Sequence, residues 1–387
     1  MSALPTYFQD FLKAIRLQED LRGELQEAHR ELTERLDHDT TLKPVLVETF
    51  LQGSYKRSTI IDPEEGDQAD VDVVVVTGLP ERLHPEPATA MDLFIPFLNA
   101  NYRGQWESQD RSFGIRQGRV WMDMVITSAP SEAMKRVLKF RAVRSRLSLE
   151  EDADFRIREA WIHPEQRTAP HNWQELMKRE GEPLGSWSED PLRIPDRTRR
   201  CWEPTHPLAQ IDWTAEKSRR CNGHYLGVVR AIKWWRRRNP KPKYPKGYPL
   251  EALIGDACPN EITSVAEGVT RTFETLEERW REMAAQQQTP FIKDHGVDQN
   301  VLGRISGEEF AEFHALVGPA SRTARRAFEA PEKEQSVLLW QDLFGGRFPD
   351  ARGGGGPGGP QDPGGGRPPG GFTPRHEVGT VGGGRFG

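Results

Sequence analysis

Cysteine is scarce in this chain, with three residues among 387, Cys201, Cys221 and Cys258. They form no CxxC pair, and an odd number of thiols cannot all pair with one another. The pattern therefore speaks against a disulfide framework and against a structural zinc site, and it favours a reducing compartment.

Long apolar runs are missing too. No segment approaches the ~20 predominantly apolar residues of a membrane-spanning helix. The first residues, MSALPTYFQDFLKAI, hold no continuous apolar stretch of the kind that a secretory signal needs. We therefore expect a cytoplasmic protein with no membrane partner.

Nor is there an excess of positive charge. The formal net charge of -5 argues against a protein that coats nucleic acid through its global charge, and we do not expect stable nucleic-acid binding. One stretch, residues 233–246, interleaves lysine and arginine with Trp234, Trp235 and Tyr244. It could bind RNA by charge and stacking, or be a solvated helix end followed by a proline-rich loop, and we favour the second interpretation.

What is present is a globular body followed by a distinct tail. Charged residues make up 29% and hydrophobic residues 36% of the chain, and its length suits two or three domains. Apolar residues recur at helical spacing from Tyr7 to Leu36, which predicts one long amphipathic helix or two helices with a break. After Asp350 the sequence turns to Gly, Pro and Arg without apolar periodicity. We predict an α+β protein with four parts: a helical spine at 1–40, a catalytic lobe at 41–215, a helical lobe at 216–345 and a disordered tail at 346–387.

Two aspartates open a strongly apolar strand. Asp70 and Asp72 lie two residues apart, just before four consecutive valines at 73–76, so both side chains project from one face of the strand. Two carboxylates this close repel each other and are costly beside a valine-rich core unless a cation holds them. Mg²⁺ fits, because it takes hard oxygen ligands and keeps positions for phosphate. A third acid, Asp123, stands in another apolar strand, and three carboxylates on adjacent strands would give a two-metal site.

A pair of aspartates of this kind also occurs where a loop merely ends at a strand edge, so the preceding residues matter. The apolar run at 45–51 leads to Gly53 and Ser54. A glycine next to a hydroxyl lets backbone N–H groups and the serine Oγ approach a triphosphate closely. The short basic stretch Lys56-Arg57 follows. The order is what is specific: apolar strand, Gly-Ser, DxD, and then a later strand aspartate.

This layout resembles the DNA polymerase β-like nucleotidyltransferase superfamily. Within it, the chain resembles the cGAS/DncV-like nucleotidyltransferases, the oligonucleotide cyclases of the CBASS antiphage system. The closer likeness rests on the N-terminal helix and on four segments, QGSYKRST at 52–59, YLGVVRAIKWWR at 225–236, YPLEAL at 248–253 and DQNVL at 298–302. It covers roughly residues 5–330. The resemblance implies a polymerase β-like lobe with a mixed β-sheet plus a helical C-terminal lobe, the bilobal architecture of cGAS and OAS.

The resemblance also implies roles for individual residues. Two Mg²⁺ ions, replaceable by Mn²⁺, would be held by Asp70 and Asp72, and Asp123 would ligate the ion that deprotonates the attacking ribose hydroxyl. Gly53 and Ser54 would bind the donor triphosphate. The further candidates for nucleotide contacts are Lys233, Arg230 one turn earlier, Gln52 and Lys56. Lys233 could instead belong to a solvated basic helix face.

The activity implied is that of a nucleotidyltransferase. It would join nucleoside triphosphates, ATP among them, into a cyclic di- or trinucleotide second messenger of antiphage defence and act on a downstream effector only through that product. An RNA-tailing or tRNA-type nucleotidyltransferase is the alternative. A non-catalytic nucleotide-binding module ranks last, because it would be expected to lose a metal carboxylate.

The glycine-rich tail ends at Gly387 and has two interpretations. It is a flexible terminus without a specific role, or it is used as in some CBASS operons, where an E1/E2-like ancillary protein joins the C-terminal residue of the cyclase to a target. A glycine on a flexible arm would suit a narrow adenylating site.

Overall fold

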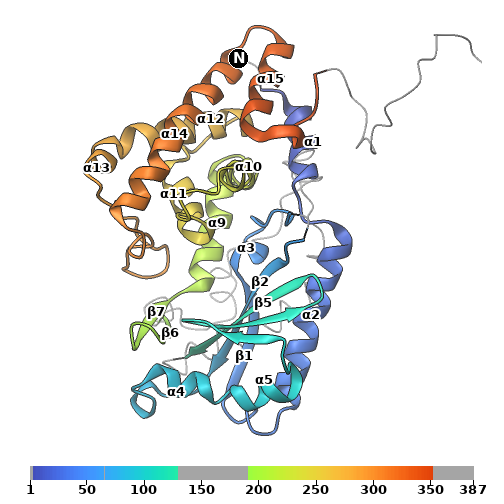
Figure 1. Cartoon of the computed structure of the whole chain (residues 1–387), viewed down its shortest axis with the longest axis vertical. Helices are drawn as coiled ribbons and strands as arrows, with labels where there is room; N and C mark the ends of the chain where they lie inside the picture. The colour runs from blue at the N-terminus through green and yellow to red at the C-terminus, as the bar shows by residue number, and fades with distance from the viewer. Residues whose placement is uncertain (1–2, 65, 130–190, 352–387) are drawn as a thin grey trace, which may run out of the picture. The chain divides into compact units, whose positions relative to one another are not determined.

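The computed structural model in Figure 1 describes residues 3–64, 66–129 and 191–351. The statements below concern these residues. Residues 130–190 lie outside them, and so does the segment 352–387 with Gly387. Among the helices that the structure describes, none has the length and apolarity to cross a membrane.

A mixed β-sheet carries the two apolar strands that the sequence predicts. Its path runs β1-β2-β5-β4-β3, and β6 and β7 extend it beyond β5. The strands are β1 (Leu46–Gln52), β2 (Ala69–Thr77), β3 (Trp106–Ser108), β4 (Phe113–Gln117), β5 (Val120–Ser128), β6 (Leu192–Asp196) and β7 (Cys201–Thr205). The central pair β2 and β5 is parallel, whereas β1 and β4 flank it in antiparallel directions.

The valine run of β2 is apolar throughout because both faces of the strand are covered. Val73 and Val75 belong to a core that includes Leu25 and Leu32, whereas Val74 and Val76 pack on the other face in a smaller cluster. A strand covered on both sides needs no alternation of polar and apolar residues. This strand therefore fixes the position of the two aspartates at its start.

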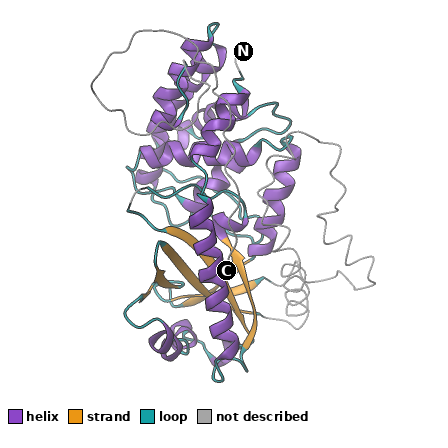
Figure 2. Cartoon of the chain, turned by 90° about the vertical axis from the view of Figure 1, so that its right-hand side faces the viewer, coloured by secondary structure: helices purple, strands orange, loops and turns teal. Residues whose placement is uncertain are grey.

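The N-terminal spine is two helices, α1 (Pro5–Ala14) and α2 (Glu19–His38). The two helices on either side of the break pack in different apolar cores. Phe8 and Phe11 of α1 are buried in the core of the helical lobe, whereas the leucines of α2 are buried in the core under the sheet. The spine thus serves both lobes. Figure 1 shows α1 near α15 and α2 beside the strands, and in Figure 2 one long helix crosses in front of the strands.

Helices make up most of the chain after β7. Short helices also connect the strands, and these are α3 (Gly53–Lys56), α4 (Pro87–Asp92) and α5 (Ile95–Asn101). The later helices are α9 (Pro207–Arg220), α10 (Tyr225–Arg238), α11 (Gly247–Ala257), α12 (Val265–Arg279), α13 (Arg281–Ala285), α14 (Gly307–Glu329) and α15 (Lys333–Phe344). Their apolar faces form one core of their own.

The sequence analysis did not predict α15. Its rings pack against the first helix, with Phe11 and Phe344 stacked at 4.6 Å and Phe8 edge-on to Trp340 at 5.0 Å. Phe348, just beyond it, is also buried. The ordered body therefore continues to Ala351 before the glycine-rich segment.

Candidate active site

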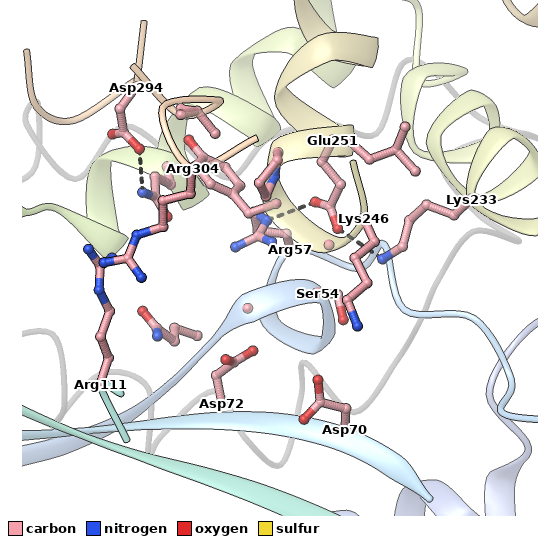
Figure 3. A pocket seen from close by; sticks show the side chains of 18 of the residues that line it. Ser54, Arg57, Asp70, Asp72, Arg111, Lys233, Lys246, Glu251, Asp294 and Arg304 are labelled. Atoms are coloured by element: carbon pink, nitrogen blue, oxygen red, sulfur yellow. Dashed lines mark hydrogen bonds and ion pairs between the residues drawn. The ribbon is translucent and has the colours of Figure 1, made fainter. Parts of the chain in front are cut away.

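A cleft of about 1150 Å³ is lined by residues of both the sheet and the later helices. The sheet side contributes Gln52, Gly53, Ser54, Arg57, Asp70 and Asp72, and the helical side includes Lys233, Lys246, Tyr248 and Glu251. Figure 3 shows Asp70 and Asp72 rising from the strand towards Ser54, with Lys233 and Lys246 on the other side. The cavity exceeds the size that one drug-sized ligand typically needs.

The three aspartates project from one face of two neighbouring strands. Asp72 of β2 and Asp123 of β5 are register partners in the parallel pair, so their side chains project from the same face, and Asp70 lies two residues earlier on that face. Asp70 and Asp72 line the cleft. Asp123 lies beside them in the neighbouring strand, where its Oδ1 accepts a hydrogen bond of 2.9 Å from Trp121 Nε1.

The carboxylates repel one another inside this site. The Asp70 side chain opens into the cleft, and the walls of the cleft surround it. This enclosure and the negative charges of Asp72 and Asp123 raise the pKa of Asp70 to about 7. Lys233 and Lys246 act in the opposite direction. Burial and Asp123 likewise raise the pKa of Asp72 to about 6. Such acids are poised to exchange protons for a cation near neutral pH.

The donor set fits Mg²⁺. No three Asp, Glu, His or Cys side chains among the described residues lie close enough to enclose a metal ion by themselves. Mg²⁺ does not require such a cage, because it is typically bound by one or two carboxylates and fills its other positions with water and substrate phosphate oxygens. Asp70 and Asp72, two hard anionic ligands open to a cleft, match that requirement.

Gly53, the first residue of α3, brings the chain close to Asp72. Its φ of +71° lies in the left-handed region, and a Cβ built on it would lie 1.6 Å from Asp72 Oδ2. Only glycine permits both the backbone conformation and this approach. The turn closes on itself, since the carbonyl oxygen of Ser54 accepts from the backbone N–H groups of Thr59 at 2.8 Å and Ile60 at 3.0 Å. Ser54 is thereby presented to the cleft above the aspartates.

A buried carboxylate joins two cations on the helical side. Glu251 of α11 accepts from Arg57 Nε at 3.0 Å and from Lys233 Nζ at 2.9 Å. Lys233 also donates to the carbonyl oxygen of Thr59 at 3.0 Å. Burial alone would raise the pKa of Glu251, but Lys233 and Arg57 outweigh it and hold the pKa at about 2. The charged triad leaves one net positive charge at this wall of the cleft.

Two of the residues predicted to contact nucleotide do not line the cleft. Arg230 is buried behind the cleft wall, where its Nε donates to the carbonyl oxygen of Ser58 at 2.9 Å. Lys56 lies on the side of α2, where its charge, together with burial, lowers the pKa of His29. Arg57, the next residue, lines the cleft instead. The sequence analysis chose Lys56 of this basic pair as a nucleotide contact, whereas Arg57 is the member that lines the cleft.

Sequence reasoning also missed the acids and arginines at the far side of the cleft. Asp196 ends β6 and is fully buried, and Arg111 Nε donates to its Oδ2 at 2.9 Å. Glu203 of β7 accepts from Arg199 at 2.7 Å. Arg304, from the loop before α14, also pairs with Asp196. These residues are far apart in the sequence, and no local motif connects them.

Known proteins are similar to this chain in sequence. A family model described as the Second Messenger Oligonucleotide or Dinucleotide Synthetase domain matches residues 1–125. The cyclic AMP-AMP-GMP synthase of Enterobacter hormaechei subsp. hoffmannii is 42% identical over 354 residues, which span 89% of this chain and 92% of that protein. The chain belongs to the cGAS/DncV-like nucleotidyltransferases of CBASS.

Solved structures of this family share the fold. CdnG of Bradyrhizobium diazoefficiens, in complex with GTP, superposes with a TM-score of 0.60 at 12% identity, covering 88% of this chain and 95% of CdnG. CdnC of Escherichia coli MS115-1, in a complex with HORMA-deltaN, gives a TM-score of 0.57 at 16% identity, covering 90% of this chain and 99% of CdnC. The predicted α+β bilobal architecture is thus confirmed.

As a member of this nucleotidyltransferase family, the protein is an enzyme that joins nucleoside triphosphates into a cyclic oligonucleotide second messenger of antiphage defence. This confirms the activity that the resemblance to this family implied. The RNA-tailing and non-catalytic alternatives are set aside. Divalent metal ions are typical of the family.

Proposed function

We propose that this cyclase makes a cyclic trinucleotide of two adenylates and one guanylate. The observation that carries the proposal is the 42% identity, over nearly the full length of both chains, to a synthase named for that product. The cleft of about 1150 Å³ can hold more than one nucleotide at a time. We assign residues 41–215 to the catalytic lobe and 216–345 to the lobe that completes the nucleotide pocket.

Asp70, Asp72 and Asp123 are proposed as ligands of two Mg²⁺ ions, for which Mn²⁺ would substitute. The ions would favour deprotonation of the attacking ribose hydroxyl and neutralise the charge of the leaving pyrophosphate. The protein orients these acids: β2 and β5 set Asp72 beside Asp123, and the indole of Trp121 holds one oxygen of Asp123. Catalysis then rests on positioning and on charge neutralisation, with no covalent step on the protein.

Donor triphosphate binding is assigned to residues on both sides of the catalytic cleft. Gly53, Ser54 and Gln52 would contact phosphate oxygens from the sheet side, and Lys233 from the helical side, where Glu251 fixes its ammonium group. Lys246, which the sequence analysis did not single out, joins them because its charge reaches Asp70. Lys56 and Arg230 are not carried into the proposal, because their side chains lie away from the cleft lining.

Labelled nucleotides test the product. Purified protein is incubated with Mg²⁺ or Mn²⁺ and with α-labelled ATP and GTP, singly and together, and the products are then treated with phosphatase. We expect a phosphatase-resistant product that contains both labels and requires both nucleotides. D70A and D72A should abolish it. Extension of added RNA without any resistant product would contradict cyclisation, and full activity in D70A and D72A would refute the metal assignment.

We also propose that Gly387 is the attachment point for an E1/E2-like ancillary protein. The support is the glycine-rich composition after Asp350. Deleting Gly387 should abolish covalent adducts in cells that express the ancillary protein, whereas synthesis in vitro should be unchanged. Adducts that persist after the deletion would contradict the proposal.

A further inference from the structure

Three arginines line the catalytic cleft on the side away from Lys233 and Lys246. We call Arg111, Arg199 and Arg304 the arginine group. They come from the segment before β4, the turn between β6 and β7, and the loop before α14. Figure 3 shows Arg111 and Arg304 approaching each other on one side of Asp72, with Lys233 and Lys246 on the other. The cleft therefore has two separate cationic ends.

The arginine group carries more positive charge than its partners neutralise. Asp196 pairs with Arg111 and Arg304, and Glu203 pairs with all three arginines. Three guanidinium groups thus face two carboxylates, which leaves one net positive charge. Burial and the nearby charges of Arg304 and Arg199 lower the pKa of Arg111. A third anion at this end would relieve that repulsion.

Geometry favours a phosphate as this anion. A guanidinium has five N–H donors, and the ion pairs of Arg111 use only its Nε and one terminal nitrogen. The side chains of Arg111, Arg199 and Arg304 keep 32%, 49% and 42% of their surface exposed. The buried carboxylate of Asp196 pairs with Arg111 and Arg304 and fixes the position of their guanidinium groups. Guanidinium groups held in this way suit the oxygens of phosphate.

The chemistry of the reaction supplies a second set of phosphates. In each transfer, a ribose hydroxyl oxygen of the acceptor attacks the α-phosphorus of the donor, the bond from that phosphorus to the bridging oxygen breaks, pyrophosphate leaves, and the hydroxyl proton passes to solvent. In a transfer between two molecules, the 5′-triphosphate of the acceptor takes no part and remains on the linear product. It is cleaved only in the last transfer, the ring closure, in which it serves as the donor group. A cleft in which two nucleotides react must therefore accommodate two triphosphates.

We propose that the arginine group binds the 5′-phosphates of the acceptor nucleotide and of the linear intermediate, while Lys233 and Lys246 bind those of the donor. This inference rests on the proposed function and assigns its second phosphate site. Arg304 comes from the helical lobe and the other two arginines from the catalytic lobe. A bound acceptor would therefore contact both lobes at once.

A single-transfer assay tests the assignment. The donor is α-labelled 2′,3′-dideoxy-ATP, which has no hydroxyl to attack, and the acceptor is either α,β-methylene-ATP, which cannot donate, or adenosine. Guanine analogues are tested in the same way. The quantity measured is the ratio of kcat/KM for the two acceptors. We expect wild type to favour the triphosphate acceptor by tenfold or more. A preference of this size corresponds to the free energy of roughly one or two charge-assisted hydrogen bonds.

The variants separate phosphate binding from structural support. R111Q should reduce the acceptor ratio about tenfold, and the more exposed R199Q several-fold, with the KM of the donor unchanged. K246Q should raise the KM of the donor and leave the ratio unchanged. The matched control is R200Q, since Arg200 is 74% exposed and pairs with Glu86 outside the cleft.

Two results would overturn the inference. One is a wild-type enzyme that uses adenosine as well as the triphosphate acceptor. The other is an R111Q or R199Q variant that slows both acceptors equally, which would make the arginine group a purely structural clasp between the lobes. A wild type that forms no cyclic product from ATP and GTP would instead contradict the proposed function, so the two failures are distinguishable.

Discussion

At the scale of single residues, Gly53 is a position where even one added carbon atom would be costly. We expect G53A to lower kcat/KM at least about a hundredfold, because a Cβ at φ +71° is strained and would lie 1.6 Å from Asp72 Oδ2. Either the turn or the carboxylate must move, and small displacements of positioning groups are costly in rate. Steady-state kinetics with circular dichroism check the loss of activity against retention of the fold.

Gly23 offers the matched control for that substitution. It lies within α2, and a Cβ built on it meets nothing within 4 Å. G23A should keep full activity and be slightly more stable, since alanine favours a helix interior over glycine. Comparable activity in G53A and G23A would show that the close approach to Asp72 is not needed.

The raised pKa values of the two aspartates predict how pH and metal affect stability. In the folded, metal-free protein the pKa values of Asp70 and Asp72 are about 7 and about 6, above the ordinary value of 3.8. The folded state therefore holds these protons where the unfolded state has released them, and stability falls as pH rises from about 4 to 7.

D70N removes one of the repelling charges and keeps the shape of the side chain. In EDTA at pH 8 we expect its melting temperature to exceed that of wild type by about 2–4 °C, with the difference disappearing near pH 4. Added Mg²⁺ should stabilise wild type more than D70N. Differential scanning fluorimetry across this pH range measures both effects, and a D70N melting temperature below that of wild type in EDTA would contradict the proposed repulsion.

At the scale of elements, the sequence predicted the strands that carry the acids because their signal is local. The valine run of β2 and the apolar β5 are recognisable from side-chain type alone, and their chain order matched a known pattern. The direction in which a side chain of a short element points cannot be predicted from the neighbouring residues alone. In the one-turn helix α3 and the residue after it, neighbouring Lys56 and Arg57 point to different surroundings.

Residues one helical turn apart pose the same problem. Arg230 and Lys233 of α10 share one face of the helix, yet one binds the carbonyl oxygen of Ser58 and the other pairs with Glu251. Only the packing of α10 against the Gly53–Thr59 turn decides between them. Asp196 and Arg304 lie 108 residues apart and form a pair only in the folded chain, so no periodicity could reveal it.

At the scale of the whole molecule, the two lobes have separate main apolar cores. Leu208 of α9 packs with Val74 and Val76 of the sheet, but the contacts between the lobes at the cleft are polar. One core lies under the sheet and the other among the later helices. Between them, Lys233 donates to Thr59, Arg57 pairs with Glu251, and Arg304 pairs with Asp196. The active site is this polar junction, so the charges that bind nucleotide are the same charges that hold the lobes in register.

Glu251 is the carboxylate on which that junction most depends. Its side chain is 5% exposed and pairs with two cations, so E251Q should lower the free energy of unfolding by about 3 kcal/mol at pH 7 and weaken nucleotide binding by releasing Lys233. The folded pKa of about 2 lies below the ordinary 4.5, so this stabilisation is complete above pH 4.5 and is lost as the pH falls towards 2. Urea unfolding of E251Q and of the exposed control E278Q, at pH 7 and at pH 3, measures the difference. A deficit in E251Q that stays constant between these pH values would mean that packing, and not the charge of Glu251, joins the lobes.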